Sequence, residues 1–284
     1  MTEFTDRFWH SRDGLKLHYR DYAGREDRPP VLCLHGLTRN ARDFEGLAAA
    51  LAGDWRVICP DMRGRGDSGY AKDSASYNPL QYADDLGALF EQAELSHVVA
   101  IGTSLGGLLT MLLAMTAPER LAGAVLNDVG PEVDPAGIER IRGYVGQGRS
   151  FPTWMHAARA LEELQAESFP DFEIADWLAM AKRCMTLGSN DRIVFDYDMK
   201  IAEPFAQSGD AGVDLWPVLA GLKDKPLLIL RGETSDILSP ATLARMLADL
   251  PKAEAVIVPR VGHAPTLDEP EARAAIDRLL ARIG

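Results

Sequence analysis

A serine between two glycines, in the run GTSLG at residues 102–106, is the sharpest chemical signal in this chain of 284 residues. The apolar run Val98–Ile101 comes directly before it, and a helix-like run follows. A serine at such a tight strand-to-helix turn takes a strained backbone that lifts its hydroxyl clear of the sheet, and only small neighbours fit around the turn. The motif therefore predicts that Ser104 is a nucleophile.

A serine hydroxyl is a poor nucleophile at neutral pH and needs a base. His263, in the run VGHAP at residues 261–265, follows the last apolar strand-like run. That position lies at the edge of the sheet where α/β proteins bind ligands. We therefore predict His263 as the base. We interpret His35 as a structural residue that orders its own loop.

The histidine in turn needs a carboxylate that orients it and stabilises its charged form. Asp236 and Glu233 both follow one strand-like run, and Asp128 follows an earlier one. The chain order Ser104, Asp236, His263 is the order typical of a nucleophile elbow of this kind, so we favour Asp236. Glu233 comes too early after its strand to reach the histidine. Asp128 stays open as the alternative acid.

The reaction also needs hydrogen-bond donors for a developing oxyanion, and losing one such donor costs about 3–4 kcal/mol of transition-state stabilisation. The backbone N–H of Leu105, directly after the nucleophile, is the first candidate. The second is the backbone N–H of Leu37, in the loop HGLT at residues 35–38 after an apolar run. Both roles use main-chain atoms, so leucine side chains are compatible with them.

Six apolar runs have the continuous hydrophobicity of strands that are buried on both faces, as a parallel sheet covered by helices requires. They lie at residues 31–34, 57–59, 98–101, 124–126, 227–230 and 255–258. Helical patterns alternate with them, at residues 44–51, 80–93, 104–116, 240–250 and 269–283. This alternation predicts a doubly wound, mostly parallel α/β sheet. Two further strand-like runs flank Asp13-Gly14, a tight-turn signal that predicts an N-terminal antiparallel hairpin.

The strands stop between Pro131 and Leu222, and these 92 residues are too many for a loop. Helix-like pieces lie there at residues 137–147, 153–167 and 174–185. We therefore predict a core of residues 1–130 and 223–284 with an inserted helical cap, residues 131–222. The cap holds ten of the 21 Phe, Trp and Tyr residues. They form either a small core of its own or the lining of an apolar substrate pocket.

With the motifs HGL (35–37), DMRGRGDSG (61–69), GTSLG (102–106) and GH (262–263), together with Asp236, the chain resembles cap-bearing members of the α/β-hydrolase superfamily. Those members include esterases, lactonases and carbon–carbon bond hydrolases. The motifs occur in the family's order and extend over nearly the whole chain. The resemblance implies an α/β-hydrolase fold and a Ser-His-Asp apparatus, with no metal and no cofactor. A serine at the elbow argues against the haloalkane dehalogenases and epoxide hydrolases, which have aspartate there.

The predicted reaction is hydrolysis of an ester or related acyl bond in a small, apolar or aromatic substrate, through an acyl-enzyme. Two other reactions on the same apparatus stay open, cleavage of a carbon–carbon bond and hydrolysis of an enol lactone. A non-catalytic, ligand-binding member of the fold is a further alternative, because a fold does not fix a function.

Composition argues against several other classes of protein. The formal net charge of −12 repels phosphate backbones, so nucleic acid is not an expected partner. Three scattered cysteines are too few for a disulfide framework or a zinc site. The N-terminus has no secretory pattern, and the longest apolar run, residues 105–117, is too short to span a bilayer. We therefore expect a cytoplasmic protein that does not bind membranes.

Overall fold

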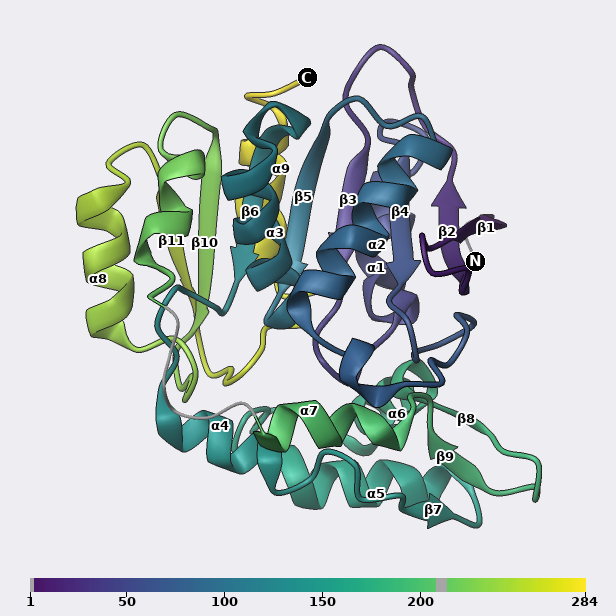
Figure 1. Cartoon of the computed structure of the whole chain (residues 1–284). Coiled ribbons are helices and arrows are strands. Elements are labelled where there is room, and N and C mark those ends of the chain that lie inside the picture. Colours follow the sequence, from purple (N-terminus) through teal and green to yellow (C-terminus); the bar gives the residue numbers. More distant parts are fainter. Residues whose placement is uncertain (1–2, 208–213) are drawn as a thin grey trace.

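An eight-stranded sheet forms the centre of the computed structural model, which describes residues 3–207 and 214–284 (Figure 1). Its order is β1-β2-β4-β3-β5-β6-β10-β11. Strands β1 and β2 form an antiparallel hairpin, β2 pairs antiparallel with β4, and the remaining neighbours are parallel. The predicted mostly parallel α/β sheet with an N-terminal hairpin is confirmed. The strands are β1 (Thr5–His10), β2 (Lys16–Tyr22), β3 (Val31–Leu34), β4 (Val57–Asp61), β5 (Val98–Thr103), β6 (Leu121–Asn127), β10 (Leu227–Gly232) and β11 (Glu254–Val258).

Helices cover both faces of this sheet (Figure 1). Helices α1 and α9 pack on one face, and α2, α3 and α8 pack on the other. Their bounds are α1 (Glu45–Leu51), α2 (Pro79–Gln92), α3 (Leu105–Thr116), α8 (Pro240–Asp249) and α9 (Pro270–Leu280). Among the described residues, no helix combines the length and the apolar character needed to cross a membrane.

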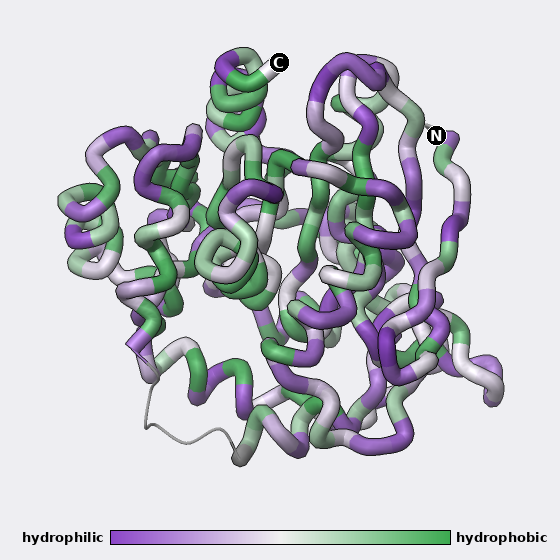
Figure 2. The backbone as a smooth tube through the Cα atoms, turned by 45° about the horizontal axis from the view of Figure 1, so that its top comes forward, coloured by the Kyte–Doolittle hydropathy of each residue, from purple (hydrophilic) through white to green (hydrophobic). Residues whose placement is uncertain are grey.

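Alternate side chains of each inner strand belong to different hydrophobic clusters. In β3, Val31 and Cys33 pack with α1 and α9, whereas Leu32 and Leu34 pack with α2 and α3. This two-sided burial explains the continuous apolar runs of the sequence. Figure 2 shows hydrophobic segments, in green, running through the middle of the molecule. At the edge strand β11 the pattern is different, because Ile257 is 45% exposed.

Between β6 and β10 the chain forms a cap segment, which we define as α4 to α7 with β7 to β9. It lies beyond the carboxyl ends of the parallel strands, at the bottom of Figure 1. Its elements are α4 (Pro135–Arg142), β7 (Ser150–Phe151), α5 (Trp154–Gln165), α6 (Ile174–Cys184), β8 (Met185–Leu187), β9 (Ile193–Phe195) and α7 (Ala202–Gln207).

Helices α4 to α6 lie where the sequence predicts helices, but the cap segment also contains a small antiparallel sheet, β7-β9-β8, and helix α7. Strands of two or three residues are too short to show a period in the sequence. The domain boundaries at residues 131 and 222 stay a prediction. Residues 208–213 of that predicted cap lie outside the described residues.

The aromatic residues of the cap segment serve chiefly as its own core. Phe169 stacks on Phe172 at 4.6 Å between ring centroids, and Trp177 meets both rings edge-on. Phe169 and Tyr144 also line the cavity described below. The expected core role is therefore seen, and a role of these aromatics in binding substrate stays a prediction.

A buried polar network holds the loop after β4 in place. The Asp61 carboxylate accepts hydrogen bonds from the backbone N–H groups of Ala41 (2.6 Å) and Asp67 (3.1 Å) and contacts His18 Nδ1 at 2.7 Å. The other ring nitrogen of His18 lies 2.9 Å from Asp6. A Cβ at Gly66 would lie 2.5 Å from the Asp61 carboxylate, so the glycine-rich motif leaves room for this acid.

This network makes stability depend on pH. Burial lowers the pKa of His18, but the hydrogen bond and charge of Asp61, the hydrogen bond of Asp6 and the charge of Asp67 outweigh burial and raise the pKa above its ordinary value of 6.5. A raised native pKa adds stability that is fully present below the unfolded pKa and is lost as pH rises through the native pKa. We predict that His18→Gln lowers the free energy of unfolding in urea more at about pH 6 than at about pH 9. His10→Gln, at an exposed position in β1, is the matched control; an equal loss for His18→Gln at both pH values would contradict the prediction.

Candidate active site

Loops after β5, β6 and β11 bring a serine, an aspartate and a histidine into one hydrogen-bonded row. Ser104 Oγ lies 3.0 Å from His263 Nε2. His263 Nδ1 lies 2.7 Å from Oδ2 of Asp128. The carboxylate is fully buried, whereas 9% of the histidine side chain is exposed. Such a row can move the hydroxyl proton onto the imidazole while the carboxylate holds the ring.

Ser104 sits on the tight turn that the glycine pattern predicts. Its φ is +53° and its ψ is −116°, between the end of β5 and the start of α3. A Cβ at Gly102 would lie 2.3 Å from the carbonyl oxygen of Gly106, and a Cβ at Gly106 would lie 1.9 Å from that of Leu34. The turn can form only because both flanking residues lack side chains.

Asp128 is held by three donors. Oδ1 accepts the backbone N–H of Gly232 at 2.9 Å, and Oδ2 accepts the Ser235 hydroxyl at 2.6 Å as well as the Nδ1–H of His263. Two of these donors come from the end of β10 and the loop that follows it. These donors fix the orientation of the carboxylate toward His263.

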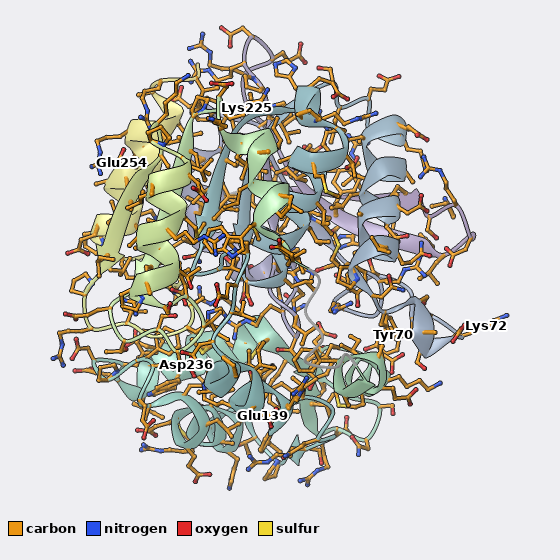
Figure 3. The ribbon with its side chains drawn as sticks, turned by 60° about the vertical axis from the view of Figure 1, so that its left-hand side comes forward. Tyr70, Lys72, Glu139, Lys225, Asp236 and Glu254 are labelled. Atoms are coloured by element: carbon orange, nitrogen blue, oxygen red, sulfur yellow. The ribbon has the colours of Figure 1, made fainter. Side chains whose placement is uncertain are left out.

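The structure corrects the preferred acid from Asp236 to Asp128. The Asp236 carboxylate pairs with Arg140 on α4, at 2.5 Å from Nε and 2.8 Å from Nη2. Burial raises the pKa of Asp236, but the hydrogen bonds and charge of Arg140 prevail and lower it. Figure 3 shows Asp236 beside the cap segment, at the opposite end of β10 from Lys225. Glu233 is engaged elsewhere, since it accepts the backbone N–H of Arg260 at 2.7 Å.

The loop after β3 passes directly beside the nucleophile. A Cβ at Gly36 would lie 3.7 Å from the Cβ of Ser104. The first turn of α3 and this loop contain the two amides predicted as oxyanion donors. Within the described part of the chain, neither the N–H of Leu37 nor that of Leu105 donates to another group.

His35 fixes the orientation of the Leu37 amide. Its Nε2 accepts the backbone N–H of Met62 at 3.0 Å, so its proton sits on Nδ1 and is donated to the Gly36 carbonyl at 2.8 Å. Burial, followed by the charge of Arg65, lowers the pKa of His35 to about 4, so the ring is neutral at pH 7. The Gly36 carbonyl and the Leu37 N–H belong to one planar peptide, so fixing one fixes the other.

Three polar side chains that had no predicted role support the site. Asn127, at the end of β6, donates from Nδ2 to the Pro265 carbonyl at 2.8 Å and to Thr103 Oγ1 at 3.0 Å, which ties the histidine loop to the elbow. Ser235 orients Asp128 as described above. Arg65, buried in the loop after β4, donates to the Leu37 carbonyl at 2.9 Å. The sequence signals for these residues are weak. Asn127 is a polar residue at the end of an apolar run, and Arg65 lies inside a glycine-rich loop.

A cavity between the core and the cap segment opens at Ser104. The core supplies the loop after β3 and residues 263–267, and the cap segment supplies the opposite wall from α4, α5 and α6. The lining residues are Gly36, Leu37, Thr38, Arg39, Asp43, Phe44, Thr103, Ser104, Ile141, Tyr144, Gln165, Phe169, Met180, Arg183, His263, Ala264, Pro265, Thr266 and Leu267. The lining therefore offers a ligand both apolar and charged groups.

One group of potential metal ligands lies in the described part of the chain, away from this cavity. His18, Asp61 and Asp67 place ligand atoms within 4.8 Å of one another. Both ring nitrogens of His18 already face carboxylates, and the Asp61 oxygens already accept backbone N–H groups. The ligand atoms of His18 and Asp61 thus already have partners within the protein.

Comparison with known proteins shows which family this chain belongs to. Residues 31–276 match the model of the alpha/beta hydrolase family. The 3-hydroxybutyrate-oligomer hydrolase of Cupriavidus necator is 35% identical over 265 residues, which cover 90% of this chain and 89% of that protein. The chain belongs to the alpha/beta hydrolase family. It is a hydrolase, like this relative.

Further relatives agree with this assignment. The 2-(acetamidomethylene)succinate hydrolase of Mesorhizobium japonicum is 28% identical over 83% of this chain and 81% of its own length. Among solved structures, an alpha/beta hydrolase from Novosphingobium aromaticivorans has a TM-score of 0.96 at 64% identity, with all of both chains covered. The expected superfamily and fold are therefore confirmed.

The two acids of this α/β hydrolase can be distinguished chemically. A fluorophosphonate reacts with a serine hydroxyl only as fast as its base and the orienting acid allow. We predict that Asp128→Asn slows this labelling by about 10²–10⁴-fold, because the histidine loses its orienting carboxylate. Asp236→Asn, the matched control, should leave the rate close to that of the unsubstituted protein. The opposite order of effects would contradict the assignment of Asp128.

Proposed function

We propose that this hydrolase cleaves a carboxylic ester through a covalent acyl-enzyme on Ser104. The observation that carries the proposal is the row from Ser104 Oγ through His263 to Asp128, which opens into the cavity. A serine next to an oriented imidazole is the arrangement that acyl transfer needs. The relative from Cupriavidus necator supports an ester over a carbon–carbon bond, because 3-hydroxybutyrate units in an oligomer are joined by ester bonds.

The first half of the proposed reaction forms the acyl-enzyme. His263 Nε2 takes the proton of Ser104 as Oγ attacks the ester carbonyl carbon, and Asp128 stabilises the imidazolium that results. The carbonyl oxygen becomes an oxyanion between the N–H groups of Leu37 and Leu105. The positive end of the α3 dipole adds to this stabilisation. When the tetrahedral intermediate collapses, the imidazolium gives its proton to the leaving alkoxide, which departs as an alcohol.

The second half releases the acid. A water molecule enters the place that the alcohol has left, and His263 takes one of its protons as the oxygen attacks the acyl carbon. The same two amides hold the second oxyanion. Collapse returns the proton to Ser104 Oγ and frees the carboxylic acid, so that one water is consumed and the side chains return to their initial state.

Ester turnover tests this proposal. We predict that the protein hydrolyses p-nitrophenyl acetate and p-nitrophenyl butyrate and is labelled by a fluorophosphonate. Ser104→Ala should abolish both, and His263→Ala should lower kcat by about 10⁴–10⁶-fold, since serine and histidine act as one unit. Ser96→Ala, at the opposite end of β5, is the matched control. A folded protein that neither labels nor turns over these esters would refute the proposal, as would activity retained by Ser104→Ala.

A further inference from the structure

The cavity at Ser104 contains a guanidinium group with unused hydrogen-bond donors. Arg39 donates from Nε to both oxygens of Asp43, at 2.9 and 2.7 Å. Within the described residues, its two terminal nitrogens have no acceptor. The side chain is 22% exposed, and Arg39 is part of the cavity lining. These donors face the cavity rather than a protein acceptor, so they are available to a ligand that supplies one.

Arg39 and Ser104 both lie next to Gly36 of the loop after β3. A Cβ at Gly36 would lie 3.6 Å from Arg39 Cγ and 3.7 Å from Ser104 Cβ. The Arg39 backbone is fixed there by its N–H, which donates to the Gly36 carbonyl at 3.2 Å. A small molecule bound at Ser104 is therefore within reach of the guanidinium.

The charges of the lining favour an anion. Two arginines, Arg39 and Arg183, face one carboxylate, Asp43, in the described lining, and burial raises the pKa of Tyr144 so that its hydroxyl stays neutral. Arg183, on the wall formed by the cap segment, reaches Asp268 outside the cavity at 3.2 Å. Each guanidinium therefore has a carboxylate partner, but the partner of Arg183 lies outside the lining, so the described lining itself holds two cations and one anion, in a chain whose formal net charge is −12. Cationic side chains in a cleft raise the local concentration of anionic ligands.

We propose that Arg39 binds a carboxylate of the substrate, so that the ester cleaved at Ser104 carries an acid group. A planar guanidinium offers a carboxylate two parallel N–H donors, and such charge-assisted pairs are about twice as strong as neutral hydrogen bonds. One carboxylate can accept hydrogen bonds from both terminal nitrogens of Arg39. Arg183 adds a second cation on the opposite wall. The inference rests on the proposed ester hydrolysis and specifies its substrate class.

Matched pairs of anionic and neutral esters test this inference. The acid group can lie on either side of the ester, so one pair is 3-acetoxybutyrate with 3-acetoxybutyramide, and the other is mono-p-nitrophenyl adipate with p-nitrophenyl hexanoate. Uncatalysed hydrolysis is subtracted for each. We expect kcat/KM for the anionic member of at least one pair to exceed that of its neutral partner by about tenfold or more. Arg39→Gln should bring this ratio close to one, chiefly through KM, and Arg39→Lys should restore part of it.

Two further variants keep the test decisive. Arg39→Gln leaves Asp43 without its partner, so Arg39→Gln/Asp43→Asn removes both charges together and should give the same loss of ratio. Arg159→Gln, at an exposed arginine of α5, should leave the ratio unchanged. A ratio near one in the unsubstituted protein, or an Arg39→Gln variant that slows both members of each pair equally, would overturn the carboxylate site. Neutral esters would still be cleaved in that case, whereas failure of the proposed function would abolish turnover of every ester and fluorophosphonate labelling.

Discussion

The site depends on one imidazole held between two oxygen atoms. His263 is positioned by Asp128 on one nitrogen and meets Ser104 on the other, at 2.7 and 3.0 Å. The three residues are far apart in the sequence, and only the parallel sheet places their loops at one edge. Asn127 then ties the histidine loop to the elbow, so the row is fixed from both sides. The rest of the fold can be understood as the frame that holds this contact.

That frame has to hold residues in conformations that side chains rarely adopt. Ser104 and Asp128 have φ values of +53° and +56°, and each such residue costs about 1–3 kcal/mol of strain. The strands that carry them are buried on both faces, and the backbone around the elbow approaches so closely that only glycine fits at Gly102 and Gly106. Tight packing keeps this turn rigid, and the rigid turn holds the Ser104 hydroxyl within hydrogen-bond distance of His263.

Most of the fold and the serine and histidine of the site could be predicted from the sequence, because continuous apolar runs, a tight glycine motif and loop positions are local signals. The acid could not. Ser235 and Asp236 are neighbours, yet the first donates to Asp128 while the second pairs with Arg140 of the cap segment. Which carboxylate faces the histidine depends on how one loop turns and on an inserted helix, and neither leaves a period in the sequence. The total charge likewise does not indicate the two arginines of the cavity lining, since it averages over the whole surface.

A crystal structure of the protein after reaction with diethyl p-nitrophenyl phosphate would test the central claim most directly. The account predicts a phosphorus atom covalently bonded to Ser104 Oγ and a phosphoryl oxygen within hydrogen-bond distance of the Leu37 and Leu105 amides. It also predicts that His263 keeps its hydrogen bond to Asp128. An adduct on another residue, a phosphoryl oxygen that points away from both amides, or a histidine turned to Asp236 would contradict it.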